Sequence, residues 1–320
     1  MRVFMVGATG TIGRATVRAL LRHGHEVVCF VRPGKAAEAA ALFPGATVRG
    51  GHVADARSIE KAGLCGENFD ALVSCLASRT GAPRDAWAVD HQAQLHVLNA
   101  ARGAGVRQVV LLSAICVQKP LLAFQQAKLA FEKELVNSGL NYSIVRATAF
   151  FKSLSGQVAR VQAGKPYLMF GDGRLTACKP ISDDDLADFL AGCLHDTRRH
   201  RRILPIGGPG PALSPLEQGE MLFALLGRAP RFKRVPVGLL DGIVGVLGSL
   251  GRVLPPLAAK AELARIGRYY ATESMLVWDA EAGRYDATVT PSHGTQTLQD
   301  HYRALISGAL RHDSGEHAVF

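Results

Sequence analysis

Apolar runs and amphipathic stretches alternate through the first half of the chain. Runs of Val, Leu and Ile without regular polar positions are typical of strands that are buried on both faces of a parallel sheet. Such runs predict strands at RVFMVGA, EVVCFVR, TVRGGHV, DALVSCLA, QVVLLSAI and NYSIVRATAF. Helical spacing of apolar residues in segments 12–24, 91–105 and 124–139 predicts helices between these strands. The alternation of the two patterns indicates an α/β fold.

The pattern is less regular after Phe150. Residues 181–194, ISDDDLADFLAGCL, predict a helix, because Ser182 is a suitable N-cap and aspartates fill the first turn. We interpret the charge run RRHRR, residues 198–202, as the solvated end of a helix. RILPIGG, residues 202–208, predicts one more strand, and proline and glycine become frequent beyond it.

The composition is that of a folded protein with a sizeable core. Hydrophobic residues make up 48% and charged residues 20% of the 320 positions. The net charge of +10 suits an anionic ligand, an acidic membrane surface or nucleic acid, and a solvated basic surface fits it equally. No nucleic-acid-binding motif accompanies this charge, so we expect no nucleic-acid partner.

The cysteines show none of the spacings that indicate a metal or redox site. They are Cys29, Cys65, Cys75, Cys116, Cys178 and Cys193, without a C-x-x-C pair. We therefore expect no metal site, no disulfide framework and a reducing compartment. The chain opens directly into a strand and lacks the apolar core of a signal peptide, which predicts a cytoplasmic protein.

Residues 235–256 come closest to a membrane-spanning segment. Asp241 and Arg252 interrupt this segment, and its five glycines weaken it as a helix. It could form a wall over a bound ligand, rest peripherally on a membrane, or pack as an ordinary lid. Basic residues just before it, Arg231, Lys233 and Arg234, could form the rim of such a binding site or be solvated loop residues.

The first strand is followed by the glycine-rich segment GATGTIG, residues 7–13. Gly7 permits a tight turn, Gly10 lets the backbone approach a pyrophosphate, and Gly13 lets helix and strand pack closely. Free amides at the helix start would face the phosphates. The position between a strand and a helix favours dinucleotide binding over an ordinary glycine-rich turn. The expected contacts are Gly7, Thr9, Gly10, Thr11, Ile12 and Gly13.

The end of the second strand indicates which dinucleotide is bound. A carboxylate at this position would hold a ribose 2′-hydroxyl, but the strand ends in Arg32. Arginine can bind a 2′-phosphate bidentately, and Lys35 could assist it. We therefore predict NADPH as the cofactor.

These patterns together predict a Rossmann-type, doubly wound parallel sheet with a smaller substrate-side lobe formed mainly by C-terminal segments. The expected division is an NADPH-binding core at 1–150, substrate-side segments at 151–180 and 209–310, a returning helix and strand at 181–208, and a flexible tail at 311–320.

The G-x-x-G-x-x-G spacing resembles the fingerprint of extended and atypical short-chain dehydrogenases. The resemblance implies that Asp55 lies near the adenine, although His52 stands where that superfamily commonly has aspartate. It also implies that the loop SCLAS, residues 74–78, covers the adenine ribose. The loop residues expected at the cofactor are Cys75, Leu76 and Ala77.

The same resemblance extends to the expected catalytic region. Ser113 ends the fifth strand, where it could contact the nicotinamide or substrate or simply cap the strand end. Lys128 matches the lysine that binds the nicotinamide ribose, but Phe124 stands where the catalytic tyrosine is expected. Ala147 and Thr148 fall where the superfamily chain passes the nicotinamide.

A narrower resemblance covers most of the chain. LLSAICVQKPLLAFQQAKLAFEKEL, YSIVRATAFFKSLSGQ and KPYLMFGDGRLTACKPISDDDLA resemble the 3,8-divinyl (proto)chlorophyllide 8-vinyl reductase family of photosynthetic organisms. The resemblance implies reduction of an 8-vinyl group to ethyl with NADPH, within chlorophyll or bacteriochlorophyll synthesis. The implied partner is a tetrapyrrole, divinyl chlorophyllide or protochlorophyllide, and peripheral contact with a photosynthetic membrane would suit it.

This chemistry explains the absence of a tyrosine at position 124. A vinyl group has no oxygen to protonate, so we interpret Phe124, together with Phe150 and Phe151, as an apolar wall against the flat ring. The proton must reach carbon from another donor, which we do not assign. Tyr167, Tyr269 and Tyr270 lie in substrate-side segments, and packing explains each of them equally well. His195 and His293 could ligate a substrate magnesium or be surface histidines.

Two further classes of protein remain open from the sequence. A non-catalytic NADPH-binding sensor or assembly factor would also keep the glycine loop and lack the tyrosine. A different reductase or a nucleotide-sugar epimerase of the same fold is the third alternative, although Phe124 removes the usual base of an epimerase.

Overall fold

The computed structural model describes the backbone of residues 1–251 and 255–310. Within these residues the main sheet is parallel, with the strand order β3-β2-β1-β4-β5-β6-β8. Its strands are β1 (Arg2–Val6), β2 (Glu26–Val31), β3 (Thr47–Gly50), β4 (Ala71–Ser74), β5 (Gln108–Ala114), β6 (Asn141–Ala147) and β8 (Arg202–Ile206). The order changes direction between β1 and β4, which is where doubly wound sheets bind ligands. The predicted α/β fold is confirmed.

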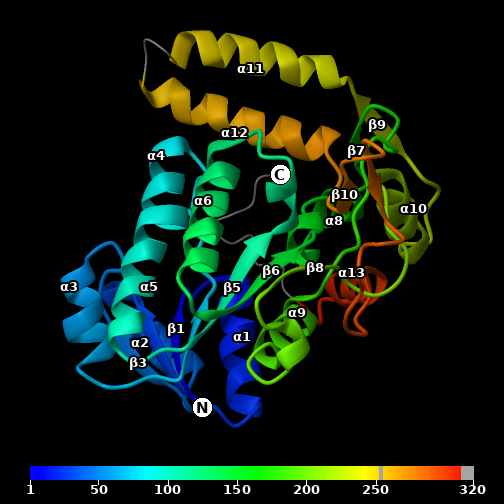
Figure 1. Ribbon diagram of the computed structural model, residues 1–320. Helices are drawn as coiled ribbons and strands as arrows, with labels where there is room; N and C mark the ends of the chain where they lie inside the picture. The colour runs from blue at the N-terminus through cyan, green and yellow to red at the C-terminus, as the bar shows by residue number, and fades with distance from the viewer. Residues whose placement is uncertain (252–254, 311–320) are drawn as a thin grey trace.

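Helices cover both faces of this sheet (Figure 1). One apolar core lies under α1 (Thr11–Arg22), α2 (Ala36–Leu42) and α9 (Asp183–Gly192). A second core lies on the opposite face, beneath η2 (Ile59–Leu64), α5 (Gln94–Gly103) and α6 (Ala123–Asn137). Shorter turns connect these layers: η1 (Pro33–Lys35), α3 (Ala56–Ser58), α4 (Pro83–Ala86), the π-helical η3 (Trp87–Ala93), η4 (Ile115–Gln118) and η5 (Thr197–Arg199).

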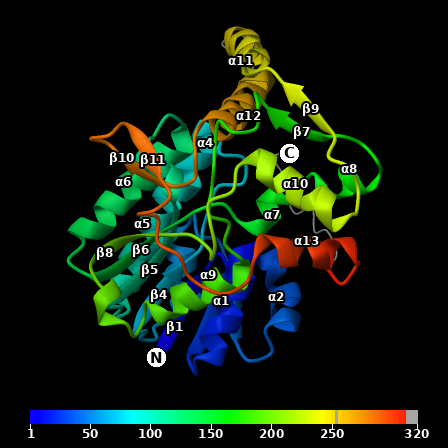
Figure 2. The same ribbon diagram turned by 90° about the vertical axis from the view of Figure 1, so that its right-hand side faces the viewer.

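A smaller lobe sits beyond the carboxyl ends of the strands (Figure 2). It has its own apolar core, in which the fully buried Tyr302 donates a hydrogen bond from its hydroxyl to the carbonyl of Leu154 over 2.9 Å. Two short sheets belong to this side of the molecule, β7–β9 and β10–β11. Its elements are α7 (Phe151–Leu154), α8 (Val158–Gln162), β7 (Tyr167–Phe170), α10 (Pro215–Leu225), β9 (Phe232–Val235) and α13 (Leu298–Ile306). The hairpin of β10 (Val277–Asp279) and β11 (Arg284–Asp286) lies apart from that core, and Val277 packs on the cluster around Phe124.

A helical hairpin of α11 (Val237–Gly251) and α12 (Pro255–Thr272) projects from the body (Figures 1 and 2). The glycines lower the helix propensity of this segment, but α11 still forms, because it packs along α12 and tertiary contact offsets poor propensity. Asp241, which interrupts the apolar run, forms an ion pair with Arg268 of α12. No described helix is long and apolar enough to cross a membrane.

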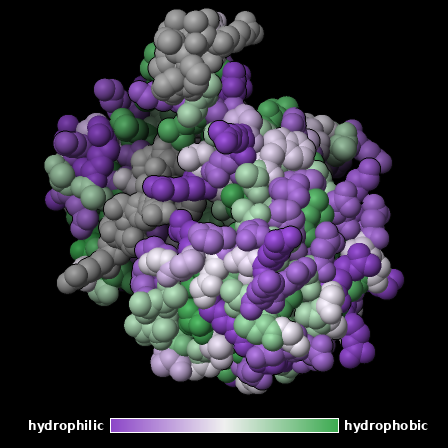
Figure 3. All heavy atoms as spheres, turned by 90° about the vertical axis from the view of Figure 1, so that its left-hand side faces the viewer, coloured by the Kyte–Doolittle hydropathy of each residue, from purple (hydrophilic) through white to green (hydrophobic). Residues whose placement is uncertain are grey.

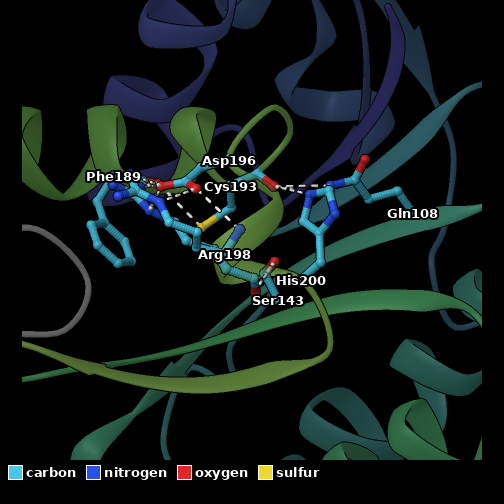
Figure 4. A network of polar contacts seen from close by, with 8 residues as sticks. Gln108, Ser143, Phe189, Cys193, Asp196, Arg198 and His200 are labelled. Carbon is cyan, nitrogen blue, oxygen red and sulfur yellow. Dashed lines mark hydrogen bonds and ion pairs between the residues drawn. The ribbon is translucent and has the colours of Figure 1, made fainter.

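The interpretation of residues 198–202 as a solvated helix end holds only in part, because Arg198, Arg201 and Arg202 are exposed whereas Arg199 and His200 are partly buried. Arg199 lies over the ring of Phe189, 4.0 Å from its centroid, and donates to the Phe189 carbonyl over 2.9 Å. His200 lies 3.0 Å from the amide nitrogen of Gln108 at the start of β5. Figure 4 shows this network, which ties the end of α9 to β5 and β6. The charges therefore close the amino edge of the sheet, the edge away from the glycine loop.

His25 is expected to make the stability of the fold depend on pH. Burial, the N-terminal amine, His195 and His23 lower the pKa of His25 from 6.5 to about 4. The unfolded chain protonates His25 more readily than the folded protein does. The contribution of His25 to the free energy of unfolding is therefore complete above pH 6.5 and is lost as the pH falls toward 4. We expect the free energy of unfolding to fall by on the order of 2 to 3 kcal/mol across this window, measured by urea denaturation.

The matched variants are His25→Asn and His52→Gln. The first removes the buried titrating group and should flatten the pH dependence between 4 and 6.5. The second changes an exposed histidine and should leave the dependence unchanged. An equally steep dependence in His25→Asn would show that another group is responsible.

Candidate active site

The glycine loop joins β1 to α1 at the carboxyl edge of the sheet. Gly7 has a φ of +79°, and a Cβ on it would lie 2.4 Å from the carbonyl carbon of Cys75. A Cβ on Gly13 would lie 2.0 Å from the carbonyl oxygen of Gly7. Gly10 is exposed, and a Cβ there would approach the same oxygen only to 3.5 Å. Gly7 and Gly13 therefore serve packing, whereas Gly10 leaves the start of α1 open to a pyrophosphate.

Basic side chains gather next to this loop. Arg32, at the end of β2, is exposed, and its side chain forms no hydrogen bond or ion pair with another described residue. Lys35 pairs with Glu38 over 2.7 Å, and Arg14 pairs with the same carboxylate over 2.9 Å. Arg14 also donates to the carbonyl of Thr9 over 3.0 Å. The cluster keeps an excess of positive charge and leaves Arg32 available for a phosphate.

Lys152 at the loop was not anticipated from the sequence, nor was the effect of its charge on the buried carboxyl group of Asp183. Lys152 of α7 donates to the hydroxyl of Thr11 over 3.1 Å, which places its ammonium at the start of α1. Burial, with Asp184 as a second cause, raises the pKa of Asp183 to about 6. Local sequence carries little signal for either residue, because α7 and α9 approach α1 only through the tertiary fold.

The loop after β4 approaches the glycine loop, and its predicted contact with the adenine ribose stays a prediction. Cys75 contacts Gly7 through its backbone, and the amide of Leu76 lies 3.4 Å from the hydroxyl of Ser74. Burial raises the pKa of the Cys75 thiol to about 12, so this sulfur stays protonated and packs as an apolar group. Ala77 follows in the same loop.

Asp55 has a local structural role in this structure. Its carboxylate caps α3 by accepting a hydrogen bond from the amide of Arg57 over 3.0 Å. The side chain remains exposed, so the predicted adenine contact stays a prediction. The amide of His52 binds the hydroxyl of Ser58 over 3.0 Å, which fixes the turn before α3.

Lys128 is held by a buried ion pair. Its ammonium lies 2.9 Å from Asp90, whose side chain is completely buried. The same oxygen of Asp90 accepts a hydrogen bond from the amide of Ser78 over 3.2 Å, while the other oxygen has no partner among the described residues. Asp90 lies in the π-helical turn η3, a feature that often accompanies functional sites. The pair fixes the lysine beside the loop that follows β4.

Ser113 is committed to a different buried network. Its hydroxyl donates to Glu132 over 2.5 Å, and Glu132 pairs with Arg146 over 2.5 Å. Glu132 belongs to α6 and Arg146 to β6, so the network joins three elements. This placement favours a structural role for Ser113 over contact with the nicotinamide or substrate.

The end of β6 is buried beneath the site. Ala147 packs in the core under α1, and Thr148 donates from its hydroxyl to the carbonyl of Lys179 over 2.5 Å. The amide of Thr148 bonds to Ile206 over 2.9 Å. Both residues lie at the carboxyl edge of the sheet, where the sequence places them, and their contact with the cofactor stays a prediction.

The three phenylalanines predicted to form one wall lie in different places. Phe124 belongs to an apolar cluster with Ile266 and Tyr269 of α12. Phe150 packs on the core beneath α9, and Phe151 is buried inside the smaller lobe. Successive residues of the chain point to opposite sides as it leaves β6, which separates Phe150 from Phe151. The three residues therefore do not form one wall, and contact of each with a substrate stays a prediction.

Of the two histidines considered as magnesium ligands, His195 lies away from this edge, whereas the backbone of His293 lies just past the end of β8 with its ring against α9. His195 stacks on His25 with ring centroids 4.9 Å apart, at the amino edge of the sheet. His293 packs edge-on against Phe189, on α9. Basic residues Arg231, Lys233 and Arg234 are exposed, and Lys233 and Arg234 lie on strand β9 instead of the expected loop.

The fold and the open glycine loop define a Rossmann-type protein that binds NAD(P)H. A family model described as NAD(P)H-binding matches residues 7–197. The divinyl chlorophyllide a 8-vinyl-reductase of Oryza sativa subsp. indica, described as chloroplastic, is 51% identical over 99% of this chain and 82% of that protein. The chain belongs to the divinyl chlorophyllide a 8-vinyl-reductase family.

More distant proteins share the fold. The photosystem II assembly factor Ycf39 of Synechocystis is 28% identical over 75% of this chain and 72% of that protein. The NADPH-dependent quinone oxidoreductase QOR2 of Escherichia coli, solved with NADPH, has a TM-score of 0.70 at 20% identity. That alignment covers 95% of this chain and 99% of the solved chain, and it supports the fold alone.

We expect Arg32→Ala to weaken NADPH binding without a comparable loss for NADH. Loss of a charge-assisted contact to the 2′-phosphate corresponds to a roughly tenfold or larger rise in the Kd for NADPH, measured by fluorescence titration. The control is Arg22→Ala, which removes an ion pair with Asp188 at the far end of α1. Equal weakening of both dinucleotides by Arg32→Ala would contradict the assignment.

Proposed function

We propose that this protein reduces the 8-vinyl group of divinyl chlorophyllide or protochlorophyllide to ethyl in chlorophyll or bacteriochlorophyll biosynthesis. The observation that carries the proposal is 51% identity to the rice reductase over 99% of the chain. NADPH is the proposed reductant, supported by the NAD(P)H-binding family match and by Arg32 at the end of β2.

The residues present at the carboxyl edge fit this cofactor. The open surface at Gly10 would receive the pyrophosphate, and Arg32 the 2′-phosphate. The loop of Cys75, Leu76 and Ala77 would cover the adenine ribose. When bound, NADPH supplies a hydride. Lys128, oriented by Asp90, would hydrogen-bond the nicotinamide ribose and hold the ring in one position.

Phe124 is consistent with this reaction. A carbonyl reductase stabilises negative charge on oxygen, so a hydroxyl acid at position 124 would assist it. Reduction of a vinyl group places negative charge on carbon, from which it can spread into the conjugated ring of the tetrapyrrole. Phe124 excludes water and offers an aromatic surface to that flat ring.

A second candidate is a non-catalytic NADPH-binding assembly factor. The similarity to Ycf39 over 75% of the chain favours it, and such a protein would also lack the tyrosine. The deciding experiment is anaerobic incubation of the purified protein with NADPH and divinyl chlorophyllide. A product heavier by two hydrogens, with a blue-shifted Soret band, supports the reductase. NADPH binding without turnover supports the assembly factor.

We predict that Lys128 is required for productive cofactor binding. Removing Lys128 alone would strand a buried carboxylate at a cost of about 3 to 5 kcal/mol, so Lys128→Met is combined with Asp90→Asn. The double variant should keep its melting temperature within a few degrees and lose at least about tenfold in kcat/KM. Lys133→Met, an exposed lysine on the same helix, is the control. Full activity in the double variant would exclude this role for Lys128.

We further propose peripheral contact between α11 and an anionic membrane surface. Leu239, Ile243 and Val246 are 54%, 39% and 61% exposed, and their spacing places them on one face of the helix. Exposed Lys233 and Arg234 lie on β9, just before α11. An apolar stripe with adjacent basic residues is suited to an interface containing acidic lipids. By contrast, the side of the molecule near α2 and α3 is mainly hydrophilic, with scattered apolar residues (Figure 3).

The membrane proposal predicts co-sedimentation with vesicles that contain phosphatidylglycerol. Leu239→Asp with Val246→Asp should lower the bound fraction at least about fivefold, because it places charge on the apolar stripe. Val289→Asp, which changes an exposed apolar residue outside the hairpin, should bind normally. Equal binding of all variants would assign the contact to another surface.

A further inference from the structure

Helix α12 reaches back from the projecting hairpin and covers the position where the usual acid is absent. Ile266 and Tyr270 are four residues apart, so they share one face of the helix. Both belong to the apolar cluster around Phe124, in which Tyr270 is partly buried. Ile266 comes so close to the turn at Gly81 that a Cβ there would lie 2.9 Å from it. The helix is therefore packed onto this region.

Tyr269 anchors the helix at this place. Its hydroxyl donates to the carbonyl of Cys116 over 2.9 Å and lies 3.2 Å from that of Lys119. Both acceptors lie at or just after η4, the turn between β5 and α6. This anchor also fixes the position of the adjacent residue, Tyr270, relative to the start of α6, where Phe124 is located.

The hydroxyl of Tyr270 lacks the strong hydrogen-bond acceptor that the hydroxyl of Tyr269 has. Its only hydrogen-bond contact among the described residues is the sulfur of Cys116, a weak partner at 4.0 Å. The hydroxyl of Tyr302 binds a backbone carbonyl, and that of Tyr285 binds Glu273 over 2.7 Å. Tyr270 thus brings a phenol to the Phe124 cluster without committing its proton to a strong acceptor.

The contact at Cys116 also relates Tyr270 to Lys128. Burial raises the pKa of the Cys116 thiol, while Gln125, Tyr270 and the positive charge of Lys128 act in the opposite direction. The thiol contacts the hydroxyl of Tyr270 over 4.0 Å, and Lys128 follows Phe124 by one turn of α6. Tyr270 and Lys128 are therefore both placed around Phe124, the first by packing and the second by helical spacing.

We propose that Tyr270 of α12 is the catalytic residue that donates the proton in the vinyl reduction, an inference that rests on the proposed function. The acid absent from position 124 of α6 is supplied instead from the helix that covers it. A flat tetrapyrrole bound between Phe124 and the nicotinamide position would present its vinyl group to this phenol.

The proposed step is balanced in atoms and electrons. A hydride from NADPH forms a C–H bond at the outer vinyl carbon, and the electron pair of the double bond moves to the inner carbon and the macrocycle. The O–H bond of Tyr270 then breaks as a second C–H bond forms at the inner carbon. The phenolate recovers a proton from water, so NADPH and one proton convert vinyl to ethyl and leave NADP+. Burial raises the pKa of Tyr270 well above 10, which keeps the phenol protonated at neutral pH until the basic carbon forms.

The first test compares Tyr270→Phe with Tyr269→Phe. Tyr270→Phe should lower kcat roughly 100-fold to 10,000-fold while the Kd values for NADPH and divinyl chlorophyllide stay within about twofold. Tyr269→Phe removes a structural hydrogen bond and should mainly lower the melting temperature. Unchanged kcat in Tyr270→Phe would overturn the inference and leave the proposed function intact. A rise in the Kd for divinyl chlorophyllide as large as the fall in kcat would also overturn it. Tyr270 would then contribute only packing against the substrate.

A second variant keeps a proton donor of different pKa. Tyr270→His should recover part of the lost turnover below about pH 6.5 and lose it as the imidazolium deprotonates at higher pH. The wild-type rate should not show this change near pH 6.5. Absence of any pH-dependent recovery in a folded Tyr270→His variant that still binds NADPH and divinyl chlorophyllide would contradict a proton-donating residue at this position.

A third measurement needs no turnover and no cofactor. In Tyr270→Cys, bound divinyl chlorophyllide should slow alkylation of the new thiol by a maleimide at least about tenfold, whereas alkylation of the exposed Cys65 should not change. Equal rates with and without the tetrapyrrole would overturn the placement of Tyr270 at the substrate. Wild-type protein that neither binds nor reduces the tetrapyrrole would instead overturn the proposed function.

Discussion

The ion pair between Lys128 and Asp90 holds together the segments from which the site is built. It joins α6 to the π-helical turn η3, and through the amide of Ser78 it also fixes the loop after β4. A completely buried carboxylate is costly unless a charge and hydrogen bonds compensate it, so the lysine cannot swing away without a large loss of stability. One oxygen of Asp90 still lacks a partner among the described residues, which is the kind of unsatisfied group that functional sites retain.

The glycine loop imposes a complementary constraint from the other side of β4. Gly7 and Gly13 have no space for a Cβ, because β1, α1 and the loop at Cys75 are already in contact. This packing places the start of α1 and the loop after β4 at fixed positions, and the ion pair then places Lys128 against the same loop. Cofactor and lysine positions are therefore set by backbone contacts and one buried charge pair, and not by flexible surface side chains.

The sequence predicted those parts of the molecule that depend on local patterns. Strands rich in Val, Leu and Ile, the glycine spacing and the Ser182 cap are each encoded within a few neighbouring residues. Asp90, Glu132 and Lys152 were not anticipated, because their roles depend on partners far away in the sequence. The same limit explains two features that local sequence did not predict. Arg199 finds Phe189 only once α9 folds back, and α11 tolerates its glycines only because α12 packs beside it.

The position of an acid in a reductase determines which atom it can protonate. A tyrosine four residues before the lysine on α6 is suited to an oxygen held next to the nicotinamide, and Phe124 removes that option. An acid on α12 approaches from the substrate side, where it can address a carbon at the edge of a large ring. Because α12 is continuous with the hairpin that carries the exposed apolar stripe, the element that provides the proton is also the element proposed to meet the membrane. Tyr269 ties α12 to the turn η4, and Ile266 and Tyr270 pack in the Phe124 cluster. The position of the proposed acid relative to Phe124 is therefore set by the same helix that carries the hairpin.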